Sequence, residues 1–246
     1  MVVGVLINIE AIDRGGKTTQ ARMVAEALET LGLKVGTMSF PDTPSRAKES
    51  TPAHFSTGEL IERDLDSNLP LMDGRDSLFR IGELAELSDE AKALIIVNVG
   101  EKLVQMLYSI NRRERRDALE AALAAHDVVL VGRYLSAYTY GVACGVSRIQ
   151  LASMEGDLRQ PDHTFLLDLD PAVAKERRAD EGYDRYEADA EFQAKVRRLY
   201  GELVREDLES AESDQRPARF TRVDADRAPE LITASIVEGI RSITGR

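Results

Sequence analysis

Residues 9–20 read IEAIDRGGKTTQ and directly follow an apolar run from Val2 to Ile9. A strand, then a glycine-rich turn, then a helix is the context of a phosphate-binding loop. Gly15 and Gly16 allow backbone N–H groups to gather around an anion. The helix that begins near Lys17 directs its free N–H groups and its positive dipole end at the same point. The stretch therefore predicts a site for a nucleoside triphosphate.

The motif G-x-x-x-x-G-K-[ST] assigns roles within this loop. Lys17 can reach the β- and γ-phosphates, and the Thr18 hydroxyl can bind Mg²⁺. Ala11 stands where the motif has its first glycine, and we expect it to be harmless only if the backbone φ there is negative. An ordinary glycine-rich turn between a strand and a helix is the alternative interpretation.

Composition narrows the class of protein. The 246 residues carry a formal net charge of -11, which repels nucleic acid and anionic lipid, so we expect neither as a partner. The single cysteine, Cys144, is expected to be a packing residue in a reducing compartment. With no room for a signal peptide and no long apolar run, a cytoplasmic location is expected.

His54, His126 and His163 show no metal-ligand spacing, so any metal is expected to be Mg²⁺ that accompanies the nucleotide.

Strand and helix patterns alternate along the chain. The expected strands are 2–9, 34–40, 127–131, 164–169 and 219–223. The expected helices are 18–31, 89–116, 117–125, 172–179, 191–208 and 228–243. This alternation indicates βαβ units around one parallel sheet, an α/β fold. We interpret residues 1–246 as a single domain with an extended segment at about 44–90 and a lid at about 177–190.

Two further sets of residues are candidates for the site. Arg133 follows a buried strand, at the sheet edge where ligands of open α/β sheets bind, and its planar fork can hold two phosphate oxygens. Its alternative is an ion pair with a structural carboxylate. Tyr108 and Arg112 are four residues apart on a predicted helix, so they could stack on a base and donate to its carbonyls. From the residues alone, Tyr108 fits the core stripe of that helix better.

The charged stretch at 176–187 contains Arg177, Arg178 and Arg185. It is equally typical of a solvated face and of a lid that brings arginines to a phosphoryl group.

Several motifs, in this order, resemble those of thymidylate kinases: the loop at 9–20, FP at 40–41, NR at 111–112, RY at 133–134, PDHT at 161–164, LDLDP at 167–171 and DRYE at 184–187. The resemblance covers nearly the whole chain except about 44–90. It implies a three-layer P-loop nucleoside-monophosphate-kinase fold, with a parallel sheet of about five strands flanked by helices. It also implies ATP-dependent phosphorylation of dTMP to dTDP in a homodimer.

The resemblance further implies site residues. The catalytic residues would be Lys17, Arg14 and Arg133. ATP would be bound by Ala11, Ile12, Asp13, Arg14, Gly15, Gly16, Lys17, Thr18, Thr19, Arg178 and Arg185, with Thr18 on Mg²⁺. The acceptor would be bound by Asp13, Phe40, Tyr108, Arg112, Arg133 and Tyr186. Within that set Asp13 would contact the 3′-hydroxyl, Tyr108 would stack on thymine and Arg112 would hydrogen-bond to it.

Gly132 departs from the family, which usually has an aspartate before the strand-end arginine. Glu10, on the neighbouring strand, is a candidate for a compensating carboxylate. Gly132 and Ala11 keep open the alternative of a nucleotide-binding protein with weak or lost kinase activity. A second alternative is a kinase for another pyrimidine monophosphate, which the pocket around Tyr108 and Arg112 would decide.

Overall fold

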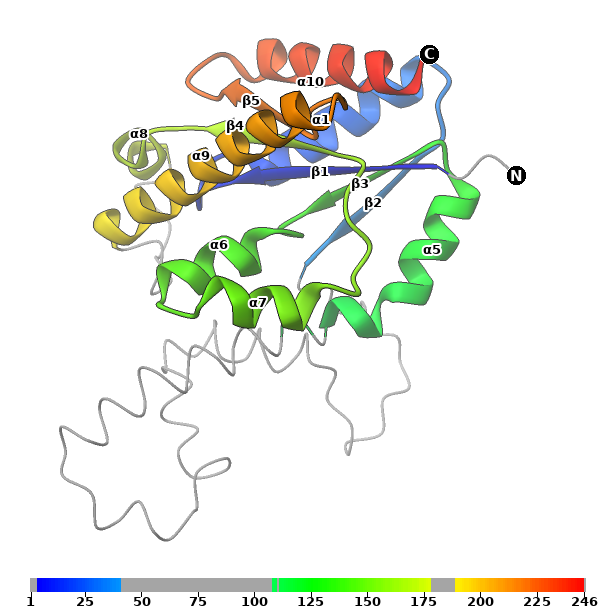
Figure 1. Cartoon of the computed structure of the whole chain (residues 1–246). Helices are drawn as coiled ribbons and strands as arrows, with labels where there is room; N and C mark the ends of the chain where they lie inside the picture. Colours follow the sequence, from blue (N-terminus) through cyan, green and yellow to red (C-terminus); the bar gives the residue numbers. More distant parts are fainter. Residues whose placement is uncertain (1–3, 41–107, 110, 178–188, 246) are drawn as a thin grey trace, which may run out of the picture.

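The structure is a computed structural model that describes residues 4–40, 108–109, 111–177 and 189–245 (Figure 1). The predicted segment at 44–90, most of the predicted helix 89–116 and most of the predicted lid lie outside these residues. Within the described part, Tyr108, Ser109 and residues 111–114 are helical, as that prediction requires.

Within the described residues, five strands form one parallel sheet in the order β2-β3-β1-β4-β5. They are β1 (Val5–Ala11), β2 (Val35–Ser39), β3 (Val128–Gly132), β4 (His163–Asp168) and β5 (Phe220–Asp224). β1 is central, and Ile9 is paired with Gly132 on one side and with Phe165 on the other. All strands point the same way, so the loop after β1 and the residues after β3 meet at one edge of the sheet. This arrangement confirms the predicted fold class.

Helices cover both faces of the sheet and complete the three layers. They are α1 (Lys17–Thr30), α5 (Arg116–Ala125), α6 (Ser136–Ala143), α7 (Arg148–Glu155), α8 (Pro171–Glu176), α9 (Ala190–Ser213) and α10 (Pro229–Thr244). α1 and α10 lie together on one face, and α5, α6 and α7 lie on the opposite face (Figure 1). α9 packs against α6 and β5.

Most predicted elements agree with the structure to within a few residues, and the differences have local causes. β1 continues to Ala11 because the strand stays buried up to the start of the loop. α9 runs five residues beyond its predicted end at Leu208 and is capped at its start by Asp189. α6 and α7 were not predicted, since each is only eight residues long. A signal for α7 existed, because Ser147 and Gln150 form a capping box.

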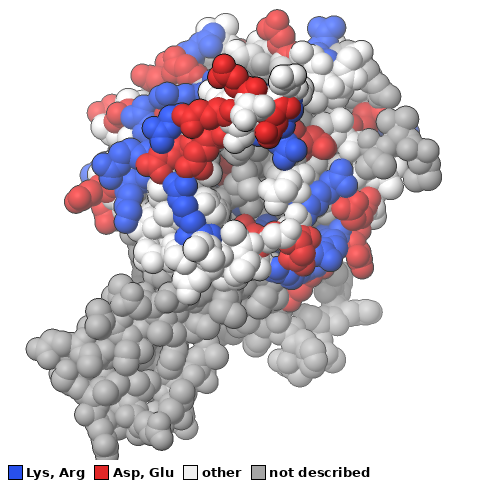
Figure 2. Space-filling view, in the orientation of Figure 1, with Lys and Arg blue, Asp and Glu red and all other residues white. Residues whose placement is uncertain are grey.

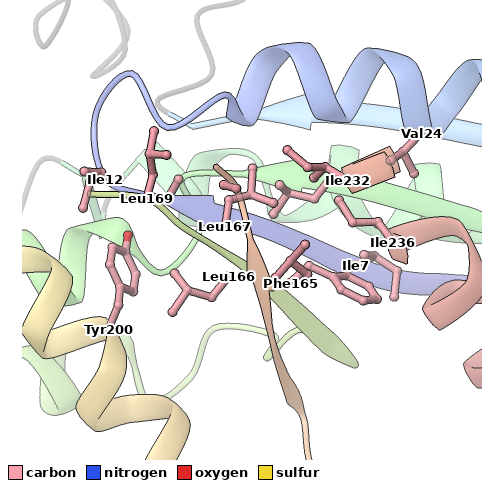
Figure 3. Packing of buried hydrophobic residues seen from close by; sticks show 14 of the residues in the cluster. Ile7, Ile12, Val24, Phe165, Leu166, Leu167, Leu169, Tyr200, Ile232 and Ile236 are labelled. Atoms are coloured by element: carbon pink, nitrogen blue, oxygen red, sulfur yellow. The ribbon is translucent and has the colours of Figure 1, made fainter. Parts of the chain in front are cut away.

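The main hydrophobic core joins the sheet to α1, α10 and α9. Ile7 and Phe165, from the two central strands, pack against Val24 of α1 and Ile236 of α10, as Figure 3 shows. All four side chains are fully buried. A sheet covered on both faces explains the near-continuous apolar runs of β1 and β3. The exceptions in β1 are the buried polar residues Asn8 and Glu10.

Candidate active site

The loop between β1 and α1 has the geometry of a phosphate-binding turn. Gly15 N donates to Ile12 O at 3.1 Å and closes the turn. Ala11 is not among the described non-glycine residues with positive φ, so its side chain is tolerated, as expected. A Cβ on Gly15 would lie 2.5 Å from the Ala11 Cβ, so the alanine makes glycine necessary at position 15.

Gly16 is the N-cap of α1 and has a left-handed backbone with φ of 93°. It brings no side-chain cap to the first turn of α1, whose N–H groups can therefore donate to an anion. Thr18 and Thr19, at the start of the helix, are exposed. The start of α1 therefore presents backbone N–H groups that can donate hydrogen bonds to a ligand.

Lys17 is held against this loop. Its Nζ donates to Ala11 O at 2.9 Å and to Ile12 O at 2.8 Å. The same Nζ lies 3.9 Å from Asp13 Oδ1, and the side chain is only 10% exposed. The loop therefore concentrates positive charge where its backbone N–H groups also point.

Two hollows meet at this charge. The first, of about 450 Å³, is lined by Arg14, Gly15, Gly16, Lys17, Thr18, Thr19, Gln20, Arg133, Arg177, Arg227, Pro229 and Ile232. The second, of about 1000 Å³, extends from Gly132 and Arg133 along α1, β2 and α5. Lys17, Thr18 and Arg133 line both hollows, so a molecule in each would face the other across these three residues.

Arg133 holds an unusual backbone conformation at the end of β3. Its φ is 58°, a left-handed value that costs a non-glycine residue about 1–2 kcal/mol. Its Nη2 lies 3.8 Å from Asp13 Oδ1, and its side chain is 43% exposed. The arginine therefore pairs loosely with a carboxylate of the loop and remains open to both hollows.

Glu10 is fully buried behind this edge of the sheet. It accepts hydrogen bonds from Leu135 N at 2.7 Å and from the Tyr200 hydroxyl at 3.0 Å. Burial raises the pKa of Glu10, and the positive charge of Lys17 opposes that rise. Glu10 lines neither hollow, so it supports the segment after β3 rather than facing a ligand.

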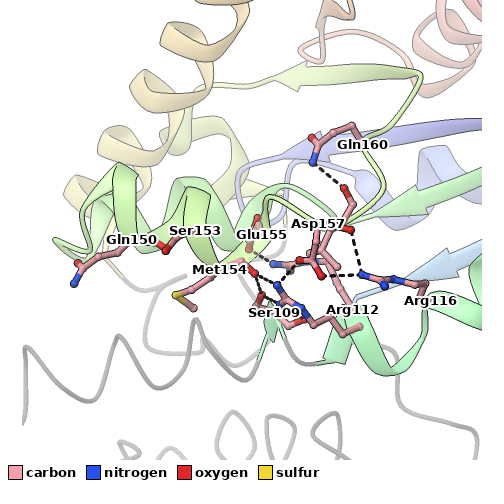
Figure 4. Close-up of polar contacts among 11 residues, drawn as sticks. Ser109, Arg112, Arg116, Gln150, Ser153, Met154, Glu155, Asp157 and Gln160 are labelled. Carbon is pink, nitrogen blue, oxygen red and sulfur yellow. Dashed lines mark hydrogen bonds and ion pairs between the residues drawn. The ribbon is translucent and has the colours of Figure 1, made fainter.

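Arg112 is buried, with 1% of its side chain exposed, and it forms an ion pair with Glu155 of α7. Beside it, Asp157 binds Arg113 and, at 2.9 Å, Arg116 (Figure 4). The Nε and Nη1 atoms of Arg112 have no hydrogen-bond partner within the described part of the chain. Its guanidinium thus keeps two buried donors for another acceptor.

The remaining predicted site residues are less closely grouped. Tyr108 is half-buried near the start of the described segment that carries Arg112. Phe40 is buried and meets the ring of Tyr134 edge-on, with centroids 5.3 Å apart. Tyr134 directly follows Arg133, so Phe40, which directly follows β2, packs against that segment. Arg178, Arg185 and Tyr186 lie outside the described residues.

Two neighbours of Asp13 were not predicted. The Tyr140 hydroxyl donates to Asp13 Oδ2 at 2.6 Å, and Gln193 Nε2 donates to the same oxygen at 2.9 Å. They lie 127 and 180 positions away along the sequence, and neither belongs to a recognisable motif. Only the packing of α6 against α9 brings them to the loop.

A central strand that leads into this loop, with an arginine at the end of the adjacent strand, defines a P-loop nucleoside monophosphate kinase. The thymidylate kinase family model matches residues 83–222. The chain belongs to the thymidylate kinase family.

Individual relatives agree with this assignment. The thymidylate kinase of Leifsonia xyli subsp. xyli is 31% identical over 244 residues, which are 95% of this chain and 92% of that protein. A thymidylate kinase of Arabidopsis thaliana is 28% identical over 81% of this chain, which spans 61% of the length of that relative. The structure of the thymidylate kinase of Candida albicans superposes with a TM-score of 0.65 at 24% identity, covering 98% of this chain and 92% of that one.

Proposed function

We propose that this protein transfers the γ-phosphoryl group of ATP to dTMP, giving ADP and dTDP. The main support for this proposal is that Lys17, Thr18 and Arg133 line both hollows. A phosphoryl transfer needs a donor and an acceptor on opposite sides of one cluster of positive charge. The donor would occupy the hollow over the loop, and the acceptor phosphate would approach from the side of Gly132.

In the reaction, an oxygen of the dTMP phosphate forms a bond to the γ-phosphorus while the bond to the β,γ-bridging oxygen of ATP breaks. Little covalent chemistry falls to the protein, because positioning and charge neutralisation provide most of the catalysis. Lys17 and the N–H groups of the loop would hold the donor phosphates. Arg14 and Arg133 would neutralise charge on the transferred group and on the acceptor phosphate.

The residues at the loop fit a Mg²⁺ ion that is delivered with the nucleotide. Thr18 is exposed and lines both hollows, which supports the proposal that its hydroxyl would be a ligand. The part of the chain that the structure describes contains no group of three acidic, histidine or cysteine side chains suited to a metal. Such an ion would take its other ligands from phosphates and water, and it would neutralise phosphate charge.

The base of the acceptor would be bound by Tyr108 and Arg112. The two buried donors of Arg112 that lack partners within the described residues support this assignment. Asp13 would contact the 3′-hydroxyl, and Phe40 would be a further acceptor-binding residue, as the family resemblance implies. We also propose that residues 177–190 form a lid carrying Arg178, Arg185 and Tyr186. At its described end, Arg177 lines the donor hollow and donates to Ala225 O at 2.7 Å.

Partners and location complete the proposal. We propose a cytoplasmic homodimer, as the family resemblance implies, without a nucleic acid or membrane partner. On the face that Figure 2 presents, acidic and basic side chains are interspersed, and the chain as a whole is acidic. Among the described residues there is no helix with the length and apolarity needed to span a membrane. The elution volume of the purified protein, with light scattering, tests the dimer.

The proposed activity is tested by ADP release from ATP and Mg²⁺, with dTMP, dUMP, dCMP, UMP and CMP each offered alone. We expect a clear preference for dTMP. A preference for another pyrimidine monophosphate would show that this nucleotide, and not dTMP, is the acceptor. ATP binding without turnover on any acceptor would overturn the proposal.

A further inference from the structure

A buried polar contact links the first turn of α1 to the first turns of α10. Gln20, in that turn of α1, is 3% exposed, and its Nε2 donates to Pro229 O at 3.0 Å. Its Oε1 accepts from the hydroxyl of Thr233 at 2.8 Å, and Thr233 is 8% exposed. Both polar atoms of the Gln20 amide therefore bind residues of α10, which lie 209 and 213 positions away along the chain.

The contact lies beside an apolar interface. Val24, one turn further along α1, and Ile232 and Ile236 of α10 are buried in the main core (Figure 3). Apolar burial is not directional, so these side chains alone tolerate more than one alignment of the two helices. A buried polar group is satisfied in only one alignment, because a shift leaves a donor or an acceptor without a partner. Gln20 and Thr233 therefore fix how α10 lies along α1.

This alignment determines the shape of the hollow over the loop. The hollow is lined at the start of α1 by Lys17 and Thr18, and at the start of α10 by Arg227, Pro229 and Ile232, which we call the far wall. Pro229 is the first residue of α10, and Arg227 lies two positions before it. A displacement of α10 along α1 would therefore move the far wall and leave the phosphate-binding loop in place.

We propose that Gln20 and Thr233 are positioning residues for the nucleotide donor, which hold the far wall at the distance from the loop that ATP requires. The inference rests on the proposed function and deepens it on the donor side. With the phosphates of ATP on the loop, the ribose and base would extend along the hollow toward the far wall. The link between the helices would then set the affinity for the nucleoside part of ATP.

The hydroxyl of Thr233 makes the link specific. Its single proton has two acceptors within reach, Gln20 Oε1 at 2.8 Å and Pro229 O at 2.9 Å. A bond to Pro229 O would leave Gln20 Oε1 buried without a donor, so the bond to Gln20 is favoured. The Gln20 amide then passes the link on to Pro229 O, and the far wall is tied to α1 by its own backbone.

Apolar substitutions of similar size separate alignment from stability. Thr233→Val leaves Gln20 Oε1 buried without a donor, so the Tm should fall. Adding Gln20→Met removes that unpaired group, so the double variant should regain most of the lost Tm. Its KM for ATP should nevertheless stay about 5- to 20-fold above that of the wild type, with kcat and the KM for dTMP changed by less than about twofold. A double variant with the wild-type KM for ATP would overturn the proposal.

A second single variant and a matched control accompany this pair. Gln20→Met alone leaves Thr233 bonded to Pro229 O, so no polar group loses its last partner and the variant should fold. It should show the same rise in the KM for ATP as the double variant. Ser235→Ala is the control, because its hydroxyl also donates four positions back along α10, to Leu231 O at 3.0 Å. This control should keep the wild-type KM for ATP.

A comparison of two ligands shows which end of the hollow is affected. Calorimetry would measure the dissociation constants of MgATP and of magnesium tripolyphosphate, which has the phosphates without the nucleoside. In the double variant the dissociation constant of MgATP should rise about 5- to 20-fold, and that of tripolyphosphate should change by less than about twofold. Equal weakening of both ligands would place the defect in the loop and would overturn the proposal.

Failure of the proposed function is seen separately, in ADP release by the wild-type protein. The dissociation constant of MgATP needs no acceptor, so it tests the inference even if no monophosphate is phosphorylated. An active wild type with an unchanged affinity for MgATP in the double variant would overturn the inference alone. A wild type that binds no MgATP would overturn the inference and the proposed function together.

Discussion

Lys17 shows how far single residues can be read from the sequence. The loop motif identified Lys17, Thr18 and the glycines, because each has a role that its residue type alone supplies. The partners of Asp13 and Arg112 were not predictable, since Tyr140, Gln193 and Glu155 come from helices far along the chain. Such contacts depend on how helices pack, which local sequence patterns do not encode.

The substitution Lys17→Ala should abolish turnover and leave the fold intact. The ammonium donates to two loop carbonyls and lies 3.9 Å from Asp13 Oδ1, so its loss removes positive charge at the junction of the two hollows. We expect kcat to fall at least about 10³-fold with a small change in Tm. The exposed substitution Lys175→Ala is the control. Turnover near the wild-type level in Lys17→Ala would rule out the proposed mechanism.

At position 132 the backbone leaves space for a side chain. Among the described residues, a Cβ there would meet only Ile9 O, at 3.9 Å, so Gly132→Asp should fold normally. The protein is proposed to work without this carboxylate, so we expect turnover to change by less than about tenfold. Steady-state kinetics with dTMP measure it. A much larger gain would show instead that Gly132 marks a site that has lost activity.

The strands and long helices could be predicted from the sequence, whereas the short helices and one contact of β1 could not. The strands and the long helices followed from apolar periodicity, because burial on one or both faces leaves a regular pattern. Short helices such as α6 and α7 are fixed mainly by tertiary packing and by end caps, so periodicity over eight residues did not reveal them. Buried Glu10 interrupts the apolar pattern of β1. Its hydrogen bond from Leu135 N, just before α6, could not be predicted from the sequence, because it depends on tertiary packing.

Glu10 should make the stability of this arrangement depend on pH. Burial raises its pKa in the folded state above the ordinary 4.5, so the folded protein binds that proton more tightly than the unfolded chain does. The corresponding stability is present below the unfolded pKa and is lost as the pH rises through the folded pKa. The free energy of unfolding of the wild type minus that of Glu10→Gln should therefore fall as the pH rises from about 4.5. Urea unfolding at a series of pH values measures this difference, and a difference that rose with pH would contradict the account.

On the scale of the whole molecule, the sheet order brings together residues that the sequence scatters. The order β2-β3-β1-β4-β5 places the loop after β1 beside the arginine after β3, and the helices around them enclose two hollows. The family model confirms the predicted family, and the parallel sheet confirms the predicted fold class. Both could be predicted because ordered motifs along most of a chain constrain the topology strongly. The roles assigned to the lid and to the acceptor pocket remain predictions.

The proposed function requires a donor and an acceptor in the two hollows, on opposite sides of Lys17 and Arg133. The most direct test is the rate of ADP release from ATP and Mg²⁺ with dTMP, compared with dUMP, dCMP, UMP and CMP at equal concentrations. We expect that turnover with dTMP clearly exceeds turnover with the other four acceptors and disappears in Lys17→Ala. Measurable ATP binding with no turnover on any of the five acceptors would contradict it.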